Sequence, residues 1–251
     1  MTNQAFFGDP ADVQTAAVGG SLTLRGPEAH HAAAVKRVRP GEEIDVLDGE
    51  GHRLSCTVVE ATHGAVVVTV DRLSFDSPPA MRLVLVQALA KGDRAELAVE
   101  AATELGVDAV LPWQADRSIV RWRAEKAIKG RAKWESLVRA ASKQSRRARV
   151  PEVLDVLDTK GLGHWLGGVQ HPVVLHEEAS ESLAEYWGRS TLAMSETLAV
   201  IVGPEGGISP EELGVLANAG AVPAQLGTNV LRASTAGPAA IAVLNHLAGR
   251  W

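Results

Sequence analysis

The chain has little of several features that define whole classes of protein. Among its 251 residues there are one cysteine, one tyrosine and three phenylalanines. A single cysteine, Cys56, excludes an internal disulfide and is typical of a reducing cytoplasm, where we expect the protein to reside. No apolar run approaches the roughly 20 residues of a membrane span. The first seven residues lack the basic region and apolar core of a secretory signal, so we expect none.

The motifs of several catalytic chemistries are also absent. There is no His-Glu-x-x-His and no pair of cysteines at ligand spacing, so we expect no metal site. No Gly-x-Ser-x-Gly supports acyl transfer. Neither Gly-x-x-x-x-Gly-Lys-Ser/Thr nor Gly-x-Gly-x-x-Gly occurs, which argues against a phosphate loop and a dinucleotide site. Cys56 lies in an alternating run, Leu54–Val58, and we interpret it as a buried structural thiol rather than a nucleophile.

The net charge of −5 conceals a strong asymmetry. Residues 117–149 contain twelve lysines or arginines against two acidic residues, Glu125 and Glu135, so this segment carries +10. The rest of the chain has thirteen basic and 28 acidic side chains and carries −15. A cationic surface on an acidic body is typical of an RNA-binding protein, and a solvated basic helix face is the alternative.

Residues 1–75 have the pattern of a small β-rich domain. Runs with strand character occupy 20–25, 43–47, 53–59 and 65–70, and residues 27–38 resemble one short helix ended by Pro40-Gly41. A small barrel with a basic helix favours RNA binding, with Arg37 and Arg39 as candidates for phosphate contacts; surface solubility is the alternative. Residues 76–80 predict a linker, because two consecutive prolines interrupt a strand ladder.

From residue 81 to residue 251 the pattern changes to alternating strands and helices. Apolar runs predict strands at 82–87, 108–112, 171–175, 198–202 and 221–226. Helices are predicted at 93–105, 123–146 and 236–248, the second being long and basic with Trp134, Leu137 and Val138 on its buried face. This alternation predicts an α/β domain with a mostly parallel sheet and helices on both faces.

The most informative segment is the glycine loop, residues 203–208, between a buried strand and a helix. Pro204 restricts the backbone, whereas Gly206 and Gly207 permit conformations and close approaches closed to other residues. Ser209 predicts an N-cap, followed by Pro210 at the first helical position and by Glu212 in a capping box. A second loop, residues 226–235, also follows an apolar run. Loops at strand ends usually bind the ligand of an α/β sheet, and a tight turn without a ligand is the alternative.

In this order along the chain, the motifs resemble the SPOUT-class methyltransferases, and more closely the bacterial 16S ribosomal RNA uracil-N3 methyltransferases. The resemblance is carried by segments 202–212, 226–227 and 230–236, and it extends to 30–41, 87–94, 102–107, 117–120 and 143–151. The chain departs from the family pattern at three places. The family has Pro-Arg at Thr228-Asn229, an acidic residue at Ser234 and glycine at Arg146.

The resemblance implies a PUA-like β-barrel at the N-terminus and a SPOUT domain whose C-terminal segment forms a trefoil knot. It implies S-adenosyl-L-methionine as the cofactor, held at the strand ends. The residues that it places against the cofactor are Leu175, His176, Glu177, Val202, Gly203, Pro204, Glu205, Gly206, Gly207, Ile208, Leu226, Gly227, Val230, Leu231, Arg232 and Ser234.

The implied reaction is methylation of N3 of the uridine at position 1498 of 16S rRNA, on the assembled 30S subunit, by a homodimer. N3 becomes nucleophilic when its proton leaves and charge spreads onto the carbonyl oxygens, so a cation beside one of them would stabilise the transition state. Arg232 is the first candidate for this catalytic role and Arg147 the second, and each could instead bind phosphate. His176 could take the proton or be structural.

The cationic segment supplies the expected RNA contacts, namely Arg117, Arg121, Arg123, Lys143 and Arg147. Two alternatives to the implied function stay open. One is a SPOUT-class enzyme that acts on another rRNA or tRNA position or on a ribose 2′-hydroxyl. The other is a ribosome-assembly factor that binds RNA without catalysis.

Overall fold

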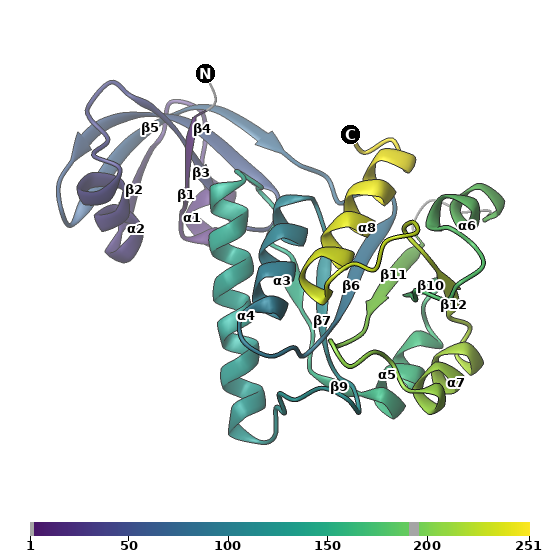
Figure 1. Ribbon diagram of the computed structural model, residues 1–251. Helices are drawn as coiled ribbons and strands as arrows, with labels where there is room; N and C mark the ends of the chain where they lie inside the picture. The colour runs from purple at the N-terminus through teal and green to yellow at the C-terminus, as the bar shows by residue number, and fades with distance from the viewer. Residues whose placement is uncertain (1–2, 191–195) are drawn as a thin grey trace. The chain divides into compact units, whose positions relative to one another are not determined.

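The computed structural model describes residues 3–190 and 196–251. Near the N-terminus, alternating apolar residues form a curled, five-stranded sheet. Its strands are β1 (Gln4–Phe7), β2 (Ser21–Arg25), β3 (Glu43–Leu47), β4 (His52–Ala61) and β5 (Ala65–Phe75). They pair in the order β1-β3-β4-β5-β2, with β1 parallel to β3 and the other pairs antiparallel (Figure 1). The four expected strands are confirmed, and β1 is an addition that the sequence pattern missed.

In the middle of β4 every second residue faces the apolar core of this unit. Leu54, Cys56 and Val58 are each about 1% exposed or less and join one apolar cluster. Burial, with a smaller contribution from nearby acidic groups, raises the pKa of the Cys56 thiol to about 12. The thiol therefore stays protonated at neutral pH, which agrees with a structural rather than a nucleophilic cysteine.

The expected helix at 27–38 is shorter and less regular. Helix α2 (Gly26–His30) continues into one π-helical turn, η1 (His31–Val35), and a further helix, α1 (Pro10–Thr15), precedes β2. The helical stretch ends because Arg37 adopts a left-handed φ of 56° and Val38 then turns into the core. Proline therefore does not end this helix, contrary to the prediction.

A return of the chain completes this first compact unit, which comprises Met1–Pro78 and Ser142–Val150. The N–H of Gly51 donates to the carbonyl of Ala148 at 3.1 Å, and the N–H of Val150 donates to the carbonyl of Gly49 at 2.9 Å. Ala148 packs with Phe7 in a small buried cluster. The division expected at residues 75 and 81 does not include this return.

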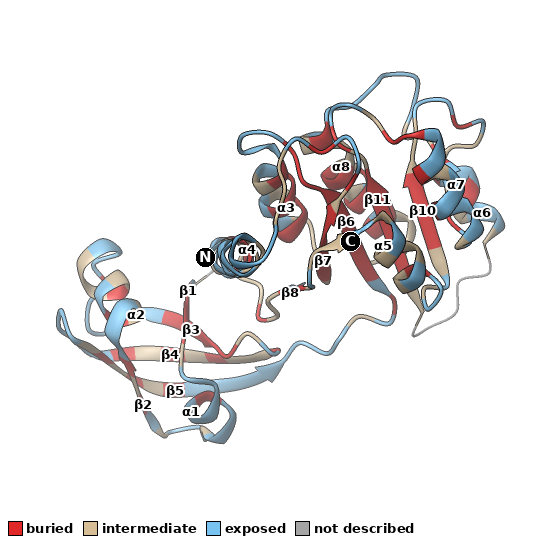
Figure 2. Cartoon of the chain, turned by 90° about the horizontal axis from the view of Figure 1, so that it is seen from below, coloured by how far each residue is buried: buried red, intermediate tan, exposed pale blue. Residues whose placement is uncertain are grey.

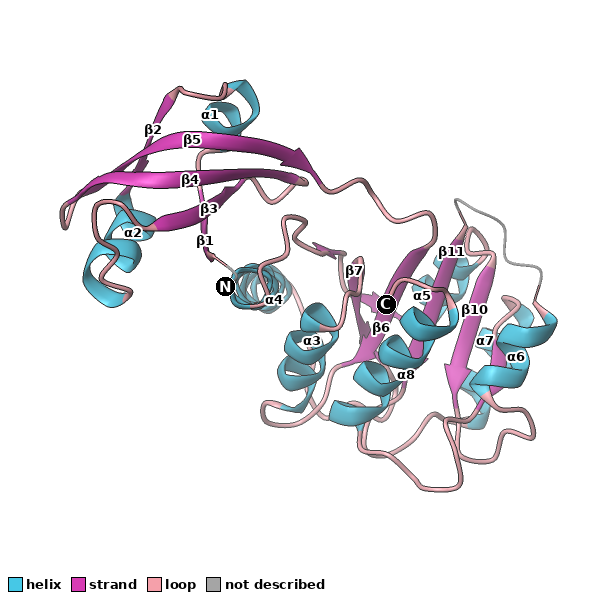
Figure 3. Cartoon of the chain, turned by 90° about the horizontal axis from the view of Figure 1, so that it is seen from above, coloured by secondary structure: helices cyan, strands magenta, loops and turns pink. Residues whose placement is uncertain are grey.

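The second unit, Pro79–Ala141 with Pro151–Trp251, contains a parallel sheet. Its strands are β6 (Arg82–Ala88), β7 (Ala109–Gln114), β8 (Glu152–Val153), β9 (Leu157–Asp158), β10 (His171–Leu175), β11 (Thr197–Val202) and β12 (Val222–Ala224). The order is β12-β10-β11-β6-β7-β8, with β9 also paired to β7, and each pair is parallel. Figure 3 labels the four central strands, β10, β11, β6 and β7. Parallel strands end at the same edge, so their C-terminal loops gather there.

Helices cover both faces of this sheet, and its strands are buried between them (Figure 2). Helices α3 (Arg94–Glu104) and α8 (Ala233–Leu247) pack on each other and on β6. Helices α5 (Thr159–Leu166) and α7 (Pro210–Asn218) pack together, and Leu162 and Leu216 join the apolar cluster of the opposite face. Helix α6 (Leu183–Arg189) contacts α8. The predicted α/β class and two-sided burial are confirmed.

The long basic helix is α4 (Glu125–Gln144), in which Trp134 and Val138 are buried as predicted, whereas Leu137 is only half-buried. It ends in a Schellman motif, because the N–H of Arg146 donates to the Lys143 carbonyl and that of Arg147 to the Ser142 carbonyl. Arg146 therefore takes a left-handed φ of 59°. Within the described residues, no helix is both long enough and apolar enough to span a membrane.

Candidate functional site

The glycine loop follows β11 and turns sharply into α7. The N–H of Gly207 donates to the carbonyl of Pro204 at 2.9 Å, and Gly207 has a φ of +73°, which favours glycine. Ser209 caps α7, and its side chain and that of Glu212 form the predicted capping box with Pro210 at the start of the helix. The loop is therefore a short, internally hydrogen-bonded turn.

Two further segments reach the same edge of the sheet. β10 ends at Leu175, and the N–H of His176 donates to the carbonyl of Ala224 at the end of β12, at 3.0 Å. The Nδ1 atom of His176 accepts from the N–H of Glu178 at 3.2 Å, so in the neutral ring Nε2 carries the proton and can act as a donor. The loop after β12 leads to Arg232, the N-cap of α8, whose side chain makes no cap hydrogen bond.

These three segments line one cavity of about 630 Å³. Of the residues expected at the cofactor, those lining it are Leu175, His176, Glu177, Val202, Gly203, Pro204, Glu205, Gly206, Gly207, Ile208, Val230, Leu231 and Arg232. Leu226 and Gly227 line a smaller adjoining hollow of about 70 Å³ together with Leu175 and Val230. Ser234 lies in the first turn of α8 and is not among the residues that line either space.

Sequence reasoning missed Arg94 at this cavity and assigned Arg117 only to RNA, yet both line it. Arg94 begins α3, after the end of β6, which lies beside β11 in the sheet. Its position at the end of the loop that follows β6 was the available signal, because neighbouring parallel strands deliver their loops to one edge.

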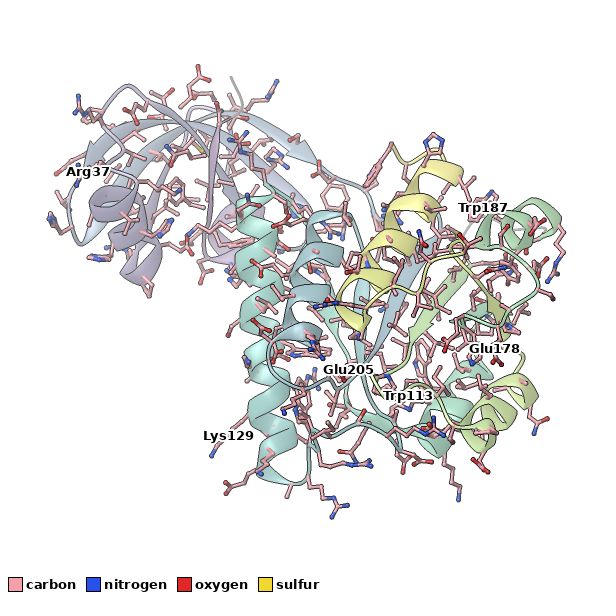
Figure 4. The ribbon with its side chains drawn as sticks, viewed as in Figure 1. Arg37, Trp113, Lys129, Glu178, Trp187 and Glu205 are labelled. Atoms are coloured by element: carbon pink, nitrogen blue, oxygen red, sulfur yellow. The ribbon has the colours of Figure 1, made fainter. Side chains whose placement is uncertain are left out.

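An ion pair crosses this edge of the sheet. Nη1 of Arg94 lies 2.8 Å from Oε1 of Glu205, which also accepts from the N–H of Lys91 at 3.2 Å. Figure 4 marks Glu205 on the loop after β11. Partial burial acts to raise the pKa of the Glu205 carboxyl, but hydrogen bonds from its own N–H, from Arg94 and from Lys91 outweigh burial. The pKa therefore lies below its usual value, and the cavity keeps a carboxylate on its wall.

Arg117 contacts the glycine loop at Gly206. Its Nη1 donates to the carbonyl of Gly206 at 2.9 Å, and its Cβ lies 3.2 Å from where a Cβ on Gly206 would stand. Arg121 donates from Nη2 to the carbonyl of Asp116 at 2.5 Å, and Arg123 is exposed. Two of the expected RNA contacts, Arg117 and Arg121, thus also make hydrogen bonds within the protein, and Arg117 lines the cavity.

The remaining cations expected to contact RNA belong to the first unit. Arg37 and Arg39 are exposed. Lys143 is mostly buried: Nζ lies 2.6 Å from Oε2 of Glu28 and 5.2 Å from the centre of the Phe6 ring. Arg147, the second candidate for catalysis, is half-buried in the returning segment. The ammonium of Lys143 is thereby engaged within the unit, whereas Arg37 and Arg39 face solvent.

Comparison with known proteins agrees with this architecture. A family model described as an RNA methyltransferase domain matches residues 77–245, and one described as an RNA methyltransferase PUA domain matches residues 24–71. Ribosomal RNA small subunit methyltransferase E of Mycobacterium tuberculosis is 41% identical over 237 residues, which are 93% of this chain and 89% of the relative. The protein of that name from Bacillus subtilis is 29% identical over 230 residues, or 90% of each chain.

A solved structure extends the likeness to three dimensions. Ribosomal RNA small subunit methyltransferase E from Neisseria gonorrhoeae, bound to S-adenosyl methionine, has a TM-score of 0.83 and 26% identity. The match covers 98% of both chains. From the domain matches, the 41% identity and the shared fold, the chain belongs to the RNA methyltransferase family that includes ribosomal RNA small subunit methyltransferase E.

Proposed function

We propose that the cavity binds S-adenosylmethionine and that the protein methylates N3 of a uridine, position 1498, in the 16S rRNA of the 30S subunit. The observation that carries the proposal is the convergence of the glycine loop, Leu175–Glu177 and Val230–Arg232 on one cavity. The relatives are named for methylation of small-subunit RNA, and the Neisseria protein was solved with this cofactor.

The residues of the cavity suit this group. The main chain of Gly206 and Gly207 lines the cavity with no side chains in the way, so its groups beyond the Gly206 carbonyl and the Gly207 N–H can meet a flat base, and Val230 and Leu231 add apolar surface. Glu177 and Glu205 place carboxylates on the wall, the second paired with Arg94, and a sulfonium group tolerates such neighbours. When bound, S-adenosylmethionine supplies the methyl group.

The chain's own contribution to the chemistry centres on Arg232. Its side chain is exposed, lines the cavity and stands at the N-cap of α8. A guanidinium there can donate to a carbonyl oxygen of the uracil, on which charge develops as N3 loses its proton. His176 does not suit the role of proton acceptor in this arrangement: its Nδ1 accepts from the main chain, so Nε2 of the neutral ring carries a proton and can donate to the uracil but not take the proton of N3.

The rRNA would be held by charges on both units. Arg117 lines the cavity and Arg123 is exposed on the second unit, and Arg37 and Arg39 are exposed on the first. Extrusion of the uridine from its stack would bring N3 into the cavity. We further propose a cytoplasmic homodimer in which the PUA-like domain of one subunit serves the active site of its partner, and a C-terminal trefoil knot around the cofactor.

The test is transfer of a tritiated methyl group from S-adenosylmethionine to 30S subunits, with free 16S rRNA in parallel. We expect incorporation into the subunit and a reverse-transcription stop at position 1498, because a methyl group on N3 blocks base pairing. Incorporation into a ribose or at another position would support the alternative enzyme. Cofactor binding without incorporation into either substrate would identify a non-catalytic assembly factor.

A further inference from the structure

A carboxylate outside the cavity links the two loops that flank it. Glu212 is 1% exposed, at the third position of α7. Its Oε2 accepts from the N–H of Ser209 at 3.1 Å, as a capping box requires. Its Oε1 accepts from the N–H of Asp116 at 2.8 Å and from Oγ1 of Thr159 at 2.7 Å. Three donors converge on this side chain, which matches the acceptor-only character of a carboxylate.

The contact of Glu212 with Asp116 goes beyond what helix capping needs. Asp116 follows β7 and Glu212 follows β11, and β6 lies between these strands. The main chain of Asp116 is held on both sides, because its carbonyl accepts from Arg121 while its N–H donates to Glu212. Thr159 in turn accepts from Nε1 of Trp113 at 3.2 Å, which ties α5 to the same point.

The next residue after this anchored point is Arg117. Its guanidinium donates to the carbonyl of Gly206, so the segment after β7 is hydrogen-bonded to the glycine loop. The single carboxylate of Glu212 therefore fixes two places at once, namely the start of α7 and the main chain that leads into Arg117. Buried, fully paired groups of this kind hold geometry tightly, because leaving a partner unpaired is costly.

We propose that Glu212 is a positioning residue for RNA recognition, which acts by holding Arg117 at the rim of the cavity. This inference rests on the proposed function, since it assigns Arg117 to the RNA. Without the Oε1 contact, the segment that carries Arg117 shifts, whereas Leu175–Glu177 and Val230–Arg232 keep their places. RNA recognition then falls more than cofactor binding.

Two variants separate this role from capping. Glu212→Asp shortens the side chain, so the carboxylate remains beside the N-cap and withdraws from Asp116. Ser209→Ala is the matched control, because it removes the cap oxygen that accepts from the N–H of Glu212 and leaves the contact with Asp116. We expect faster hydrogen exchange of the Asp116 N–H in Glu212→Asp and not in Ser209→Ala.

The decisive measurement is a double-mutant cycle on kcat/KM for 30S methylation, with the cofactor Kd measured in parallel. Glu212→Asp alone should lower kcat/KM about tenfold or more, as misplacement of a substrate-binding group does. In an Arg117→Ala background the same change should cost less than about twofold, the margin expected of additive sites. The proposal is overturned if the losses of kcat/KM caused by Glu212→Asp and Arg117→Ala multiply in full in the double variant. It is also overturned if the hydrogen exchange rate of the Asp116 N–H is unchanged in Glu212→Asp.

The proposed function can fail separately. If the wild-type protein transfers no methyl group to either substrate, the cycle is measured on the affinity for 16S rRNA and on its salt dependence. Loss of the Arg117 contact should flatten the salt dependence in Glu212→Asp and in Arg117→Ala alike. An unchanged slope in Glu212→Asp, beside a flattened one in Arg117→Ala, refutes the positioning role whatever the reaction is.

Discussion

Replacing Gly203 by alanine should distort the cavity through one contact. A Cβ at this position would stand 2.6 Å from Cγ1 and 3.2 Å from Cδ1 of Ile208. Carbon atoms are at their best separation at about 3.5–4.0 Å, so the added methyl group falls roughly 1 Å short. Ile208 is 8% exposed, lines the cavity and belongs to the apolar cluster under α5 and α7, so it has little room to retreat.

The expected cost of this overpacking is ~1–3 kcal/mol. If the loop keeps its shape, the strain lowers the free energy of unfolding, and for a chain of this size each kcal/mol lowers Tm by about 2–4 °C. If the loop changes shape instead, it must return to the strained shape when the cofactor binds. The free energy of binding then falls by the same amount, and the cofactor Kd rises by about fivefold to 150-fold. The two readouts together should account for the cost.

Calorimetric titration with S-adenosylmethionine and a thermal melt measure both quantities. Gly214→Ala is the matched control, because Gly214 lies within α7 and its Cβ would meet nothing within 4 Å. That change should leave affinity unchanged and keep or raise Tm. Adding Ile208→Ala to Gly203→Ala should give a smaller total loss than the two single losses combined. A Gly203→Ala protein with wild-type Tm and wild-type affinity would refute the reasoning.

Three more predictions follow from the structure. Arg232→Ala should leave stability within about 0.5 kcal/mol, since the side chain is exposed, but lower single-turnover methyl transfer by about 10²–10³-fold; an unchanged rate contradicts its catalytic role. The lowered pKa of Glu205 stabilises the fold above the unfolded-state value near 4.3, and this contribution disappears as pH falls through the folded value. Glu205→Gln should therefore weaken the fall in the free energy of unfolding at acid pH, measured by urea titrations at a series of pH values. A pH dependence identical to that of the wild type would contradict this. Arg146→Gly should raise stability by ~1 kcal/mol, because it relieves a left-handed φ of 59°, whereas Ala132→Gly within the same helix should lower stability by ~1 kcal/mol. Denaturant midpoints of the two variants that shift in the same direction would contradict this.

The left-handed φ of Arg146 also gives the reason for one of the three departures from the family pattern. The resembled family has glycine where this chain has Arg146, and that residue is the one after the C-cap of α4 in a Schellman motif. Glycine adopts this conformation without a steric penalty, whereas arginine does so at a cost. The sequence comparison located the position, and the backbone geometry accounts for it.

Local patterns were sufficient wherever the determining interactions lie within a few residues. The capping box of Ser209 and Glu212, the apolar run of β11 and the alternation around Cys56 are all of this kind, and the structure confirms them. The glycine loop and the loop after β12 were placed at strand ends by the same reasoning, because parallel strands share one edge. Most residues expected at the cofactor accordingly line one cavity.

Contacts between distant segments were decided only by the tertiary structure. Arg94 meets Glu205 across 111 positions, Asp116 meets Glu212 across 96, and Lys143 meets Glu28 across 115. Such pairs depend on strand order and register, which no local periodicity encodes. The same cause brought Ser142–Val150 back to the first unit and engaged Lys143 there. Hydrophobic periodicity and helix caps depend on residues that are neighbours in the sequence, whereas long-range contacts between side chains depend on how the whole chain packs.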